Sequence, residues 1–154
     1  MTRGQLTTVP QMLDFMLGGN ATLTVESRSG KHYTYKVKRA KDRDDGPAHA
    51  PLRWFVNLLS GPDNTGDFTY IGLLEQRDGY RLNFRLTSAS RLGKNTAPVA
   101  GFAWLVRNIV DENEKKLGQA RVFHEGRCSR CNRKLTDPVS ISTGIGPVCA
   151  GREE

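Results

Sequence analysis

The sequence lacks any run of eighteen apolar residues, so it contains no transmembrane helix of ordinary length. Its first eight residues also lack the apolar stretch of a secretory signal. We therefore expect a cytoplasmic protein with no membrane partner.

Cysteine is scarce as well. The chain has three cysteines, which cannot all pair with one another, and a reducing cytosol disfavours disulfides. These thiols are therefore better explained by metal binding than by redox chemistry.

The chain has fewer acidic than basic residues. Lys and Arg number 23 against 16 Asp and Glu, which gives a formal net charge of +7 and a pI near 9.6 in a chain of 154 residues. Such a balance attracts anionic partners, most obviously nucleic acid, although it is also compatible with simple solubility. The length fits one domain, or one domain with a small appendage.

Alternation of apolar and polar residues predicts five strands separated by short turns. The first two, residues 21–27 and 32–39, form a hairpin in which Lys36 and Lys38 face outward. The last, residues 80–86, turns Arg81 and Arg85 outward. The predicted strands cover residues 21–27, 32–39, 53–59, 67–75 and 80–86. Short turns between them favour a curled antiparallel five-stranded meander.

Two helices are predicted around these strands. A short one follows Thr8 and stops at the pair Gly18-Gly19. A long one runs from Ala97 to Lys116, with Thr96 as its cap and an amphipathic stripe that suits it to cover the sheet. The expected fold class is therefore α+β. We expect two parts, a sheet-and-helix domain at residues 1–118 and a small metal-binding module at residues 119–154.

The C-terminal segment carries the spacing of a zinc site. Cys128 and Cys131 are separated by two residues, so both thiolates can converge on one tetrahedral ion, and Cys149 can return to complete a third corner. His124 is the nearest candidate for the fourth ligand. Carboxylates or water are alternatives, the carboxylates being Glu125, Asp137 and Glu153.

Ordinary burial of the cysteines is the competing interpretation, since cysteine is often a core residue. However, the segment has little apolar material, and a segment this polar needs a cross-link in order to fold. We therefore predict a structural Zn²⁺ site. The knuckle is surrounded by basic residues, namely Arg127, Arg130, Arg133 and Lys134.

Three motifs share this segment: Cys128-x-x-Cys131, Leu135-Thr-Asp-Pro-Val-Ser140 and Gly144-Ile-Gly-Pro-Val-Cys149. Together they resemble a short uncharacterised domain found in proteins of bacteriophages and actinobacteria. The resemblance implies a zinc module in a phage or phage-derived protein, which would place it in the host cytoplasm, and it implies no particular activity. Asn132 stands where that family commonly has Gly, and Asn tolerates the left-handed conformation that such a knuckle needs.

The sequence offers little for catalysis, because no nucleophile, base and open metal site come together in a recognisable pattern. His124 is followed by Glu125 and Gly126, which does not fit the deaminase signature. We therefore expect a binding protein rather than an enzyme.

Two partner classes remain open. The first is nucleic acid, bound through basic residues on the strands and the knuckle. The alternative is a host or defence protein complex, which a small phage protein would bind and modulate. The residues predicted to contact nucleic acid are Lys36, Lys38, Arg81, Arg85, Arg127, Arg130, Arg133 and Lys134.

Overall fold

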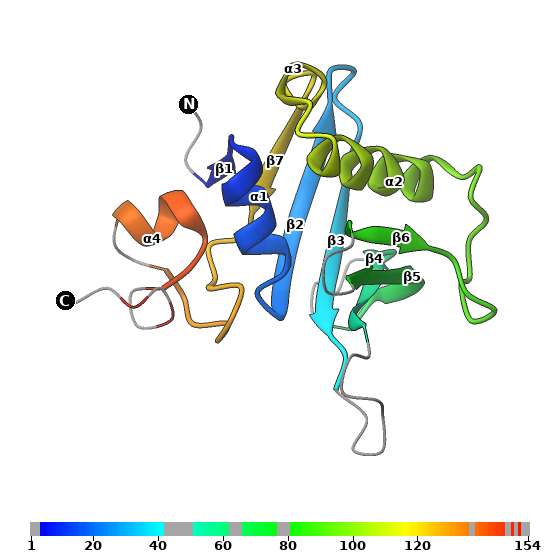
Figure 1. Ribbon diagram of the computed structural model, residues 1–154, viewed down its shortest axis with the longest axis horizontal. Helices are drawn as coiled ribbons and strands as arrows, with labels where there is room; N and C mark the ends of the chain where they lie inside the picture. Colours follow the sequence, from blue (N-terminus) through cyan, green and yellow to red (C-terminus); the bar gives the residue numbers. More distant parts are fainter. Residues whose placement is uncertain are drawn as a thin grey trace.

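The structure is a computed structural model that describes residues 4–41, 51–61, 66–76, 81–135, 138–146, 149 and 151. An antiparallel sheet carries the fold, with helices packed against it (Figure 1). In chain order the elements are β1 (Gln5–Leu6), α1 (Val9–Met16), β2 (Asn20–Ser27), β3 (His32–Arg39), β4 (Leu52–Leu59), β5 (Phe68–Gln76), β6 (Asn83–Arg85), α2 (Ala97–Val110), α3 (Glu114–Leu117), β7 (Ala120–His124) and α4 (Pro138–Thr143).

The sheet has seven strands in the order β1-β7-β2-β3-β4-β5-β6. The α+β class is confirmed. The predicted curled sheet of five strands is wrong, because the sheet is open and has two further strands, with β1 and β6 at its edges; the five predicted strands do lie side by side in chain order, as β2 to β6. The additional strands are β1, which has two residues, and β7, which pairs with β1 and β2 from the far end of the chain. Alternation of apolar and polar residues cannot reveal a strand as short as β1. It also cannot reveal the pairing of β7 with strands from the other end of the chain.

The pairing of β2 with β3 follows the predicted faces. Leu23 lies opposite Tyr35, and both are buried on the side that carries the helices. Lys36 and Lys38 alternate with these residues and therefore lie on the opposite side, which we call the outer face of the sheet.

The fifth predicted strand is shorter than expected. Residue 80 lies outside the described residues, and β6 spans only Asn83–Arg85. Leu82 and Phe84 still pack against the core, while Arg81 and Arg85 are exposed. The predicted alternation of this segment is thus confirmed even though pairing is confined to its centre.

The long helix is interrupted. α2 ends at Val110, and α3 begins only at Glu114, so a single helix to Lys116 is wrong. Glu112 adopts a left-handed φ of 51°, which no helix interior accommodates. Asn113 then starts the next turn by accepting a hydrogen bond from the backbone N–H of Lys116.

The helices cover one face of the sheet. In α2, Thr96 occupies the N-cap, but its hydroxyl donates to the carbonyl of Gly93 instead of capping the helix. In α1, the Thr8 hydroxyl does cap, accepting from the N–H of Gln11. The sheet and the two longer helices share one core that includes Phe15, Tyr35, Trp54, Ile71, Phe102 and Val122. Within the part of the chain that the structure describes, none of the helices combines the length and apolar character needed to cross a lipid bilayer.

Candidate metal centre

The first two cysteines lie in a tight knuckle between β7 and α4. The backbone N–H of Cys128 donates to the carbonyl of Arg133, 2.8 Å away, and the N–H of Asn132 donates back to the carbonyl of Cys128, 2.9 Å away. Asn132 has a φ of 65°, so it takes the left-handed position that the resemblance assigned to Gly. We call residues 126–135 the knuckle.

Three sulfur atoms converge at this knuckle. The Sγ atoms of Cys128, Cys131 and Cys149 all lie within 4.8 Å of one another, and none of the three forms a disulfide. Cys128 is buried, Cys149 is partly exposed and Cys131 is exposed. A tetrahedral zinc ion with Zn–S bonds of about 2.3 Å separates its sulfurs by about 3.8 Å, so the cluster is of the size that a metal ion requires.

The electrostatics of the cluster favour a thiolate at Cys128. Burial raises the pKa of this thiol, but backbone N–H groups of Cys131, Gly146 and Arg130 point at the sulfur and outweigh burial, which brings the pKa down to about 7. The Arg130 nitrogen lies 3.4 Å from Sγ. The hydrogen bond with the Cys131 side chain, together with burial, raises the pKa of Cys149 to about 11.

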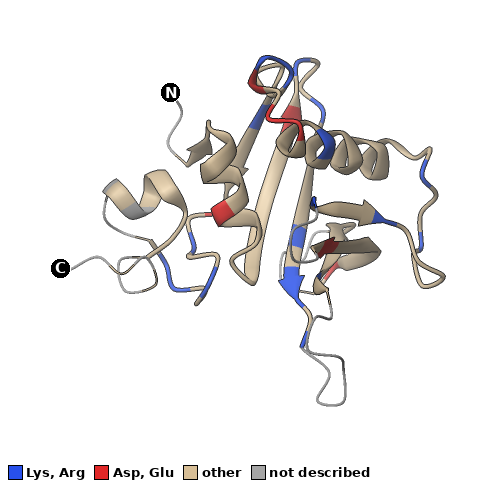
Figure 2. Ribbon diagram, viewed as in Figure 1, with Lys and Arg blue, Asp and Glu red and all other residues tan. Residues whose placement is uncertain are grey.

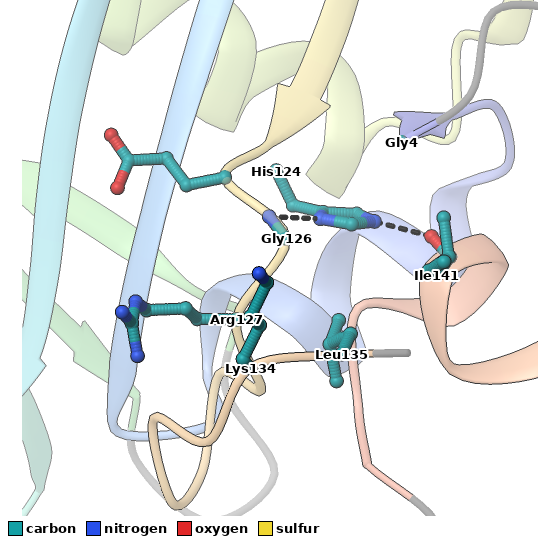
Figure 3. A pocket seen from close by; sticks show the side chains of 8 residues that line it. Gly4, His124, Gly126, Arg127, Lys134, Leu135 and Ile141 are labelled. Atoms are coloured by element: carbon teal, nitrogen blue, oxygen red, sulfur yellow. Dashed lines mark hydrogen bonds between the residues drawn. The ribbon is translucent and has the colours of Figure 1, made fainter. Parts of the chain in front are cut away.

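His124 does not join the cluster. Its Nδ1 accepts a hydrogen bond from the N–H of Gly126 at 2.9 Å, and its Nε2 therefore carries the proton and donates to the carbonyl of Ile141 (Figure 3). The ring also lies 5.6 Å, centroid to centroid, from Phe15. To bind a metal, the imidazole would have to give up one of these hydrogen bonds.

The knuckle is bound to the start of β2. The backbone N–H of Asn20 donates to the carbonyl of Ser129 at 2.6 Å, and the Asn20 side-chain amide donates to the carbonyl of Arg130 at 2.8 Å. The N–H of Ser129 in turn donates to the carbonyl of Gly144 at 3.0 Å. The arm that carries Cys149 and the knuckle are thereby both held against the sheet.

Two glycines allow this close approach. A Cβ on Gly18 would collide with the hydroxyl of Ser129 and lie 2.9 Å from its carbonyl oxygen. A Cβ on Gly144, whose φ is +76°, would collide with the ring of Phe15. Glycine is therefore required at both positions, for space at Gly18 and for space and backbone conformation at Gly144.

We call the contact between Asn20 and the knuckle the joint. Most of the basic residues predicted to contact nucleic acid lie near it. Lys36 and Lys38 are on the outer face, and Lys38 lies opposite Asn20, which binds the knuckle. Figure 2 shows Lys and Arg along both the knuckle and the end of β3. The predicted residues of the knuckle, all exposed, are Arg127, Arg130, Arg133 and Lys134.

The Glu125 carboxyl lies near one cation of the knuckle and one cation of β3. Burial raises the pKa of the Glu125 carboxyl, against the opposing effect of two nearby cations, Arg127 and Lys36. Arg85 lies further along the outer face, at β6. Arg81 is set apart, because it pairs with Asp111 at the end of α2, with 2.6 Å between Nη2 and Oδ1.

Sequence reasoning missed three residues of the outer face: Arg53, Phe55 and Tyr70. Phe55 is 42% exposed, although it lies in a strand of otherwise ordinary apolar composition. The signal was present, because Trp54, Val56 and Leu58 alternate with Phe55 and are buried. Alternation along β4 alone was therefore sufficient to identify an outward-facing aromatic residue.

Comparison with known proteins gives a match for the C-terminal part of the chain. Residues 119–153 match a family of unknown function, DUF6011. The predicted resemblance of this segment to an uncharacterised family is thereby confirmed. No curated protein and no solved structure matches the chain.

Proposed function

We propose that this protein binds nucleic acid through the basic residues of the knuckle and the outer face of the sheet, and that Zn²⁺ holds the knuckle together. The observation that supports the proposal is the pair of Asn20 hydrogen bonds to the knuckle, since they hold the cations of the knuckle beside the strand pair that carries Lys36 and Lys38. Both sets were singled out from the sequence.

Zinc is the metal that the donors suit best. Three thiolates form a soft donor set, and zinc is the usual ion at a Cys-x-x-Cys knuckle closed by a third cysteine. Among the described residues, the apolar cluster beneath the knuckle is small: its buried members are Cys128, Leu135 and Ile145. Such a cluster cannot stabilise the module alone, whereas zinc-finger peptides gain about 10–16 kcal/mol from their metal.

The zinc proposal is tested by native mass spectrometry of protein purified without added metal. We expect one zinc per chain, and loss of zinc when Cys131, the exposed ligand, is replaced by Ser. Ser142→Ala, in α4, is the matched control because it changes a hydroxyl of the same module and leaves the three sulfurs in place. A metal-free wild-type protein would contradict the proposal.

The nucleic-acid proposal is tested by fluorescence anisotropy with labelled single-stranded and duplex oligonucleotides across a salt series from about 50 to 200 mM. Each neutralised phosphate contributes a slope of about −0.9 for duplex DNA and about −0.7 for single strands in a plot of log affinity against log salt. A steep negative slope is therefore expected.

The variant that tests the surface is Lys36→Ala with Lys38→Ala and Arg133→Ala. Its control removes the same charge elsewhere, by replacing Arg107, Lys115 and Lys116 on α2 and α3, which are all exposed. Only the first triple variant should lose affinity and reduce the salt slope. Equal losses would mean that net charge, rather than this surface, drives binding.

The alternative proposal, a phage protein that modulates a host or defence complex, makes a different prediction. Association through an apolar protein interface changes little with salt. The phage or actinobacterial setting rests on the resemblance of the C-terminal segment and is part of the proposal.

A further inference from the structure

The outer face of the sheet carries a row of side chains that runs across four strands. Lys38 on β3 lies opposite Phe55 on β4, Phe55 lies opposite Leu73 on β5, and Leu73 lies opposite Arg85 on β6. Neighbouring strands are about 4.8 Å apart, so the row extends about 14 Å from cation to cation. The ring of Phe55 and the apolar side chain of Leu73 therefore lie between two cations, Lys38 and Arg85.

Three residues of this row, Phe55, Leu73 and Arg85, line a cleft of about 430 Å³. Leu73 is 5% exposed and forms the floor, while Phe55 is 42% exposed and forms a wall. The Tyr70 ring meets Phe55 edge to face, with 6.1 Å between centroids and 73° between planes. Its hydroxyl is fixed by a hydrogen bond with the Thr87 hydroxyl at 3.1 Å. The cleft thus presents a free aromatic surface held in place by a second ring.

The charges around the cleft are mainly positive. Arg53 and Arg85 line it, and Glu75, the acidic residue beside them on β5, is paired with Arg85. In the described segments, Lys38 and Arg53 form no ion pair. Lys36 lies over the ring of Phe68, with Nζ 5.6 Å from its centroid. A ligand with flat apolar groups on an anionic backbone complements this arrangement.

We propose that this cleft binds an unpaired base of single-stranded nucleic acid, stacked on Phe55, with the flanking phosphates held by Lys38 and Arg53. The inference rests on the proposed nucleic-acid function and assigns its substrate class. Bases in a duplex are stacked on one another, so their faces are not available to Phe55, whereas a single strand offers them to any exposed ring.

A protein partner fits the cleft less well. Protein interfaces are enriched in Arg and aromatic residues but depleted of Lys, and Lys38 lies directly opposite Phe55. Here, by contrast, the exposed ring has cations on both sides, which is the combination of stacking platform and electrostatic groove that single strands require.

The test compares binding of oligothymidine, oligouridine and a duplex, each of about 20 nucleotides, to the zinc-loaded wild-type protein and to variants at Phe55. Phe55→Ala should weaken binding of the single strands by about tenfold, whereas Phe55→Trp should retain it. Leu52→Ala is the matched control, since Leu52 is another exposed apolar residue of β4 but lies on the side opposite Phe55. Single-strand affinity should exceed duplex affinity, and comparison of the DNA and RNA strands shows which sugar is preferred.

The outcomes separate this inference from the proposed function. If duplex and single strands bound equally and Phe55→Ala had no effect on affinity, the stacking site would be overturned. The proposal that the protein binds nucleic acid would still stand. Absence of binding to all three oligonucleotides would overturn both. If Phe55→Ala instead weakened a salt-insensitive association with a protein, the cleft would be assigned to a protein partner. This result would also overturn the inference.

Discussion

The side-chain amide of Asn20 donates a hydrogen bond to the carbonyl oxygen of Arg130, with 2.8 Å between Nδ2 and O. These residues are 110 positions apart in the chain, one at the start of β2 and the other in the knuckle between the first two cysteines. The contact satisfies a backbone acceptor of the knuckle and fixes its position against the sheet. The cysteine cluster is therefore held against the strands that form the outer face.

Replacing Asn20 by Ala should loosen this joint. One hydrogen bond is lost, which lowers the free energy of unfolding by about 0.5–1.5 kcal/mol, while the backbone N–H of residue 20 keeps its bond to Ser129. Chemical denaturation of the zinc-loaded protein measures the change. Asn83→Ala, on the exposed edge strand β6, is the control and should alter stability by no more than about 0.5 kcal/mol. Equal effects of the two variants would mean that the amide of Asn20 contributes nothing to the joint.

Gly18→Ala should separate the knuckle from the end of α1. The new methyl group would meet both the hydroxyl and the backbone of Ser129, so side-chain rotation cannot relieve the collision. A cost of about 1–3 kcal/mol is expected, typical of overpacking in a rigid contact. Gly93→Ala is the control, because a Cβ there meets nothing within 4 Å. Thermal unfolding of both variants should show a lowered midpoint for Gly18→Ala alone.

Local spacing made the convergence of Cys128 and Cys131 predictable. Cys128 and Cys131 converge because two residues between them close a tight turn, and the left-handed Asn132 follows from the same turn geometry. The joint was not predictable in this way. Asn20 and Arg130 meet through a pairing of distant segments, and neither residue differs locally from an ordinary polar surface residue.

The same contrast applies to the fold. The hairpin of β2 and β3 followed from period-two alternation, which fixes both the strands and their faces. The break after α2 could not be predicted from such a pattern. Glu is a good helix former, and nothing in its side chain signals the left-handed φ of Glu112. Glu112 lies in the link between α2, which ends at Val110, and α3, which begins at Glu114.

His124→Gln should preserve zinc binding. Both ring nitrogens are engaged in hydrogen bonds, to Gly126 and Ile141, so the structure gives this side chain a role in joining β7 to α4. We expect a zinc content of one per chain together with a loss of stability of about 1–3 kcal/mol, since a buried donor or acceptor is left unsatisfied. The visible spectrum of the Co²⁺-substituted protein checks whether the ligand set changes.

A different result would support the prediction that His124 is a ligand. If His124→Gln abolished zinc binding as completely as Cys131→Ser, the imidazole would have to rotate away from Ile141 when the metal binds. His124 would then be the fourth ligand, as its position close to the knuckle in the sequence first suggested.

Tyr35→Phe should make the protein less stable at neutral pH and less sensitive to alkali. The Tyr35 hydroxyl donates to the carbonyl of Pro98 at 2.6 Å, and its loss should cost about 1 kcal/mol at pH 7. Burial, with a smaller contribution from Tyr33, raises the pKa of Tyr35 above its ordinary value of about 10. Below that value the phenol is neutral in both the folded and the unfolded protein, so its ionisation does not affect stability there.

As the pH rises above about 10, the unfolded chain loses this proton while the folded protein keeps it. Wild-type stability should then fall by up to about 1.4 kcal/mol per pH unit from this group alone, and that part of the slope should vanish in Tyr35→Phe. Urea denaturation at a series of pH values between about 8 and 11 measures both effects. An unchanged slope would mean that the phenol ionises as easily inside the core as in the unfolded chain.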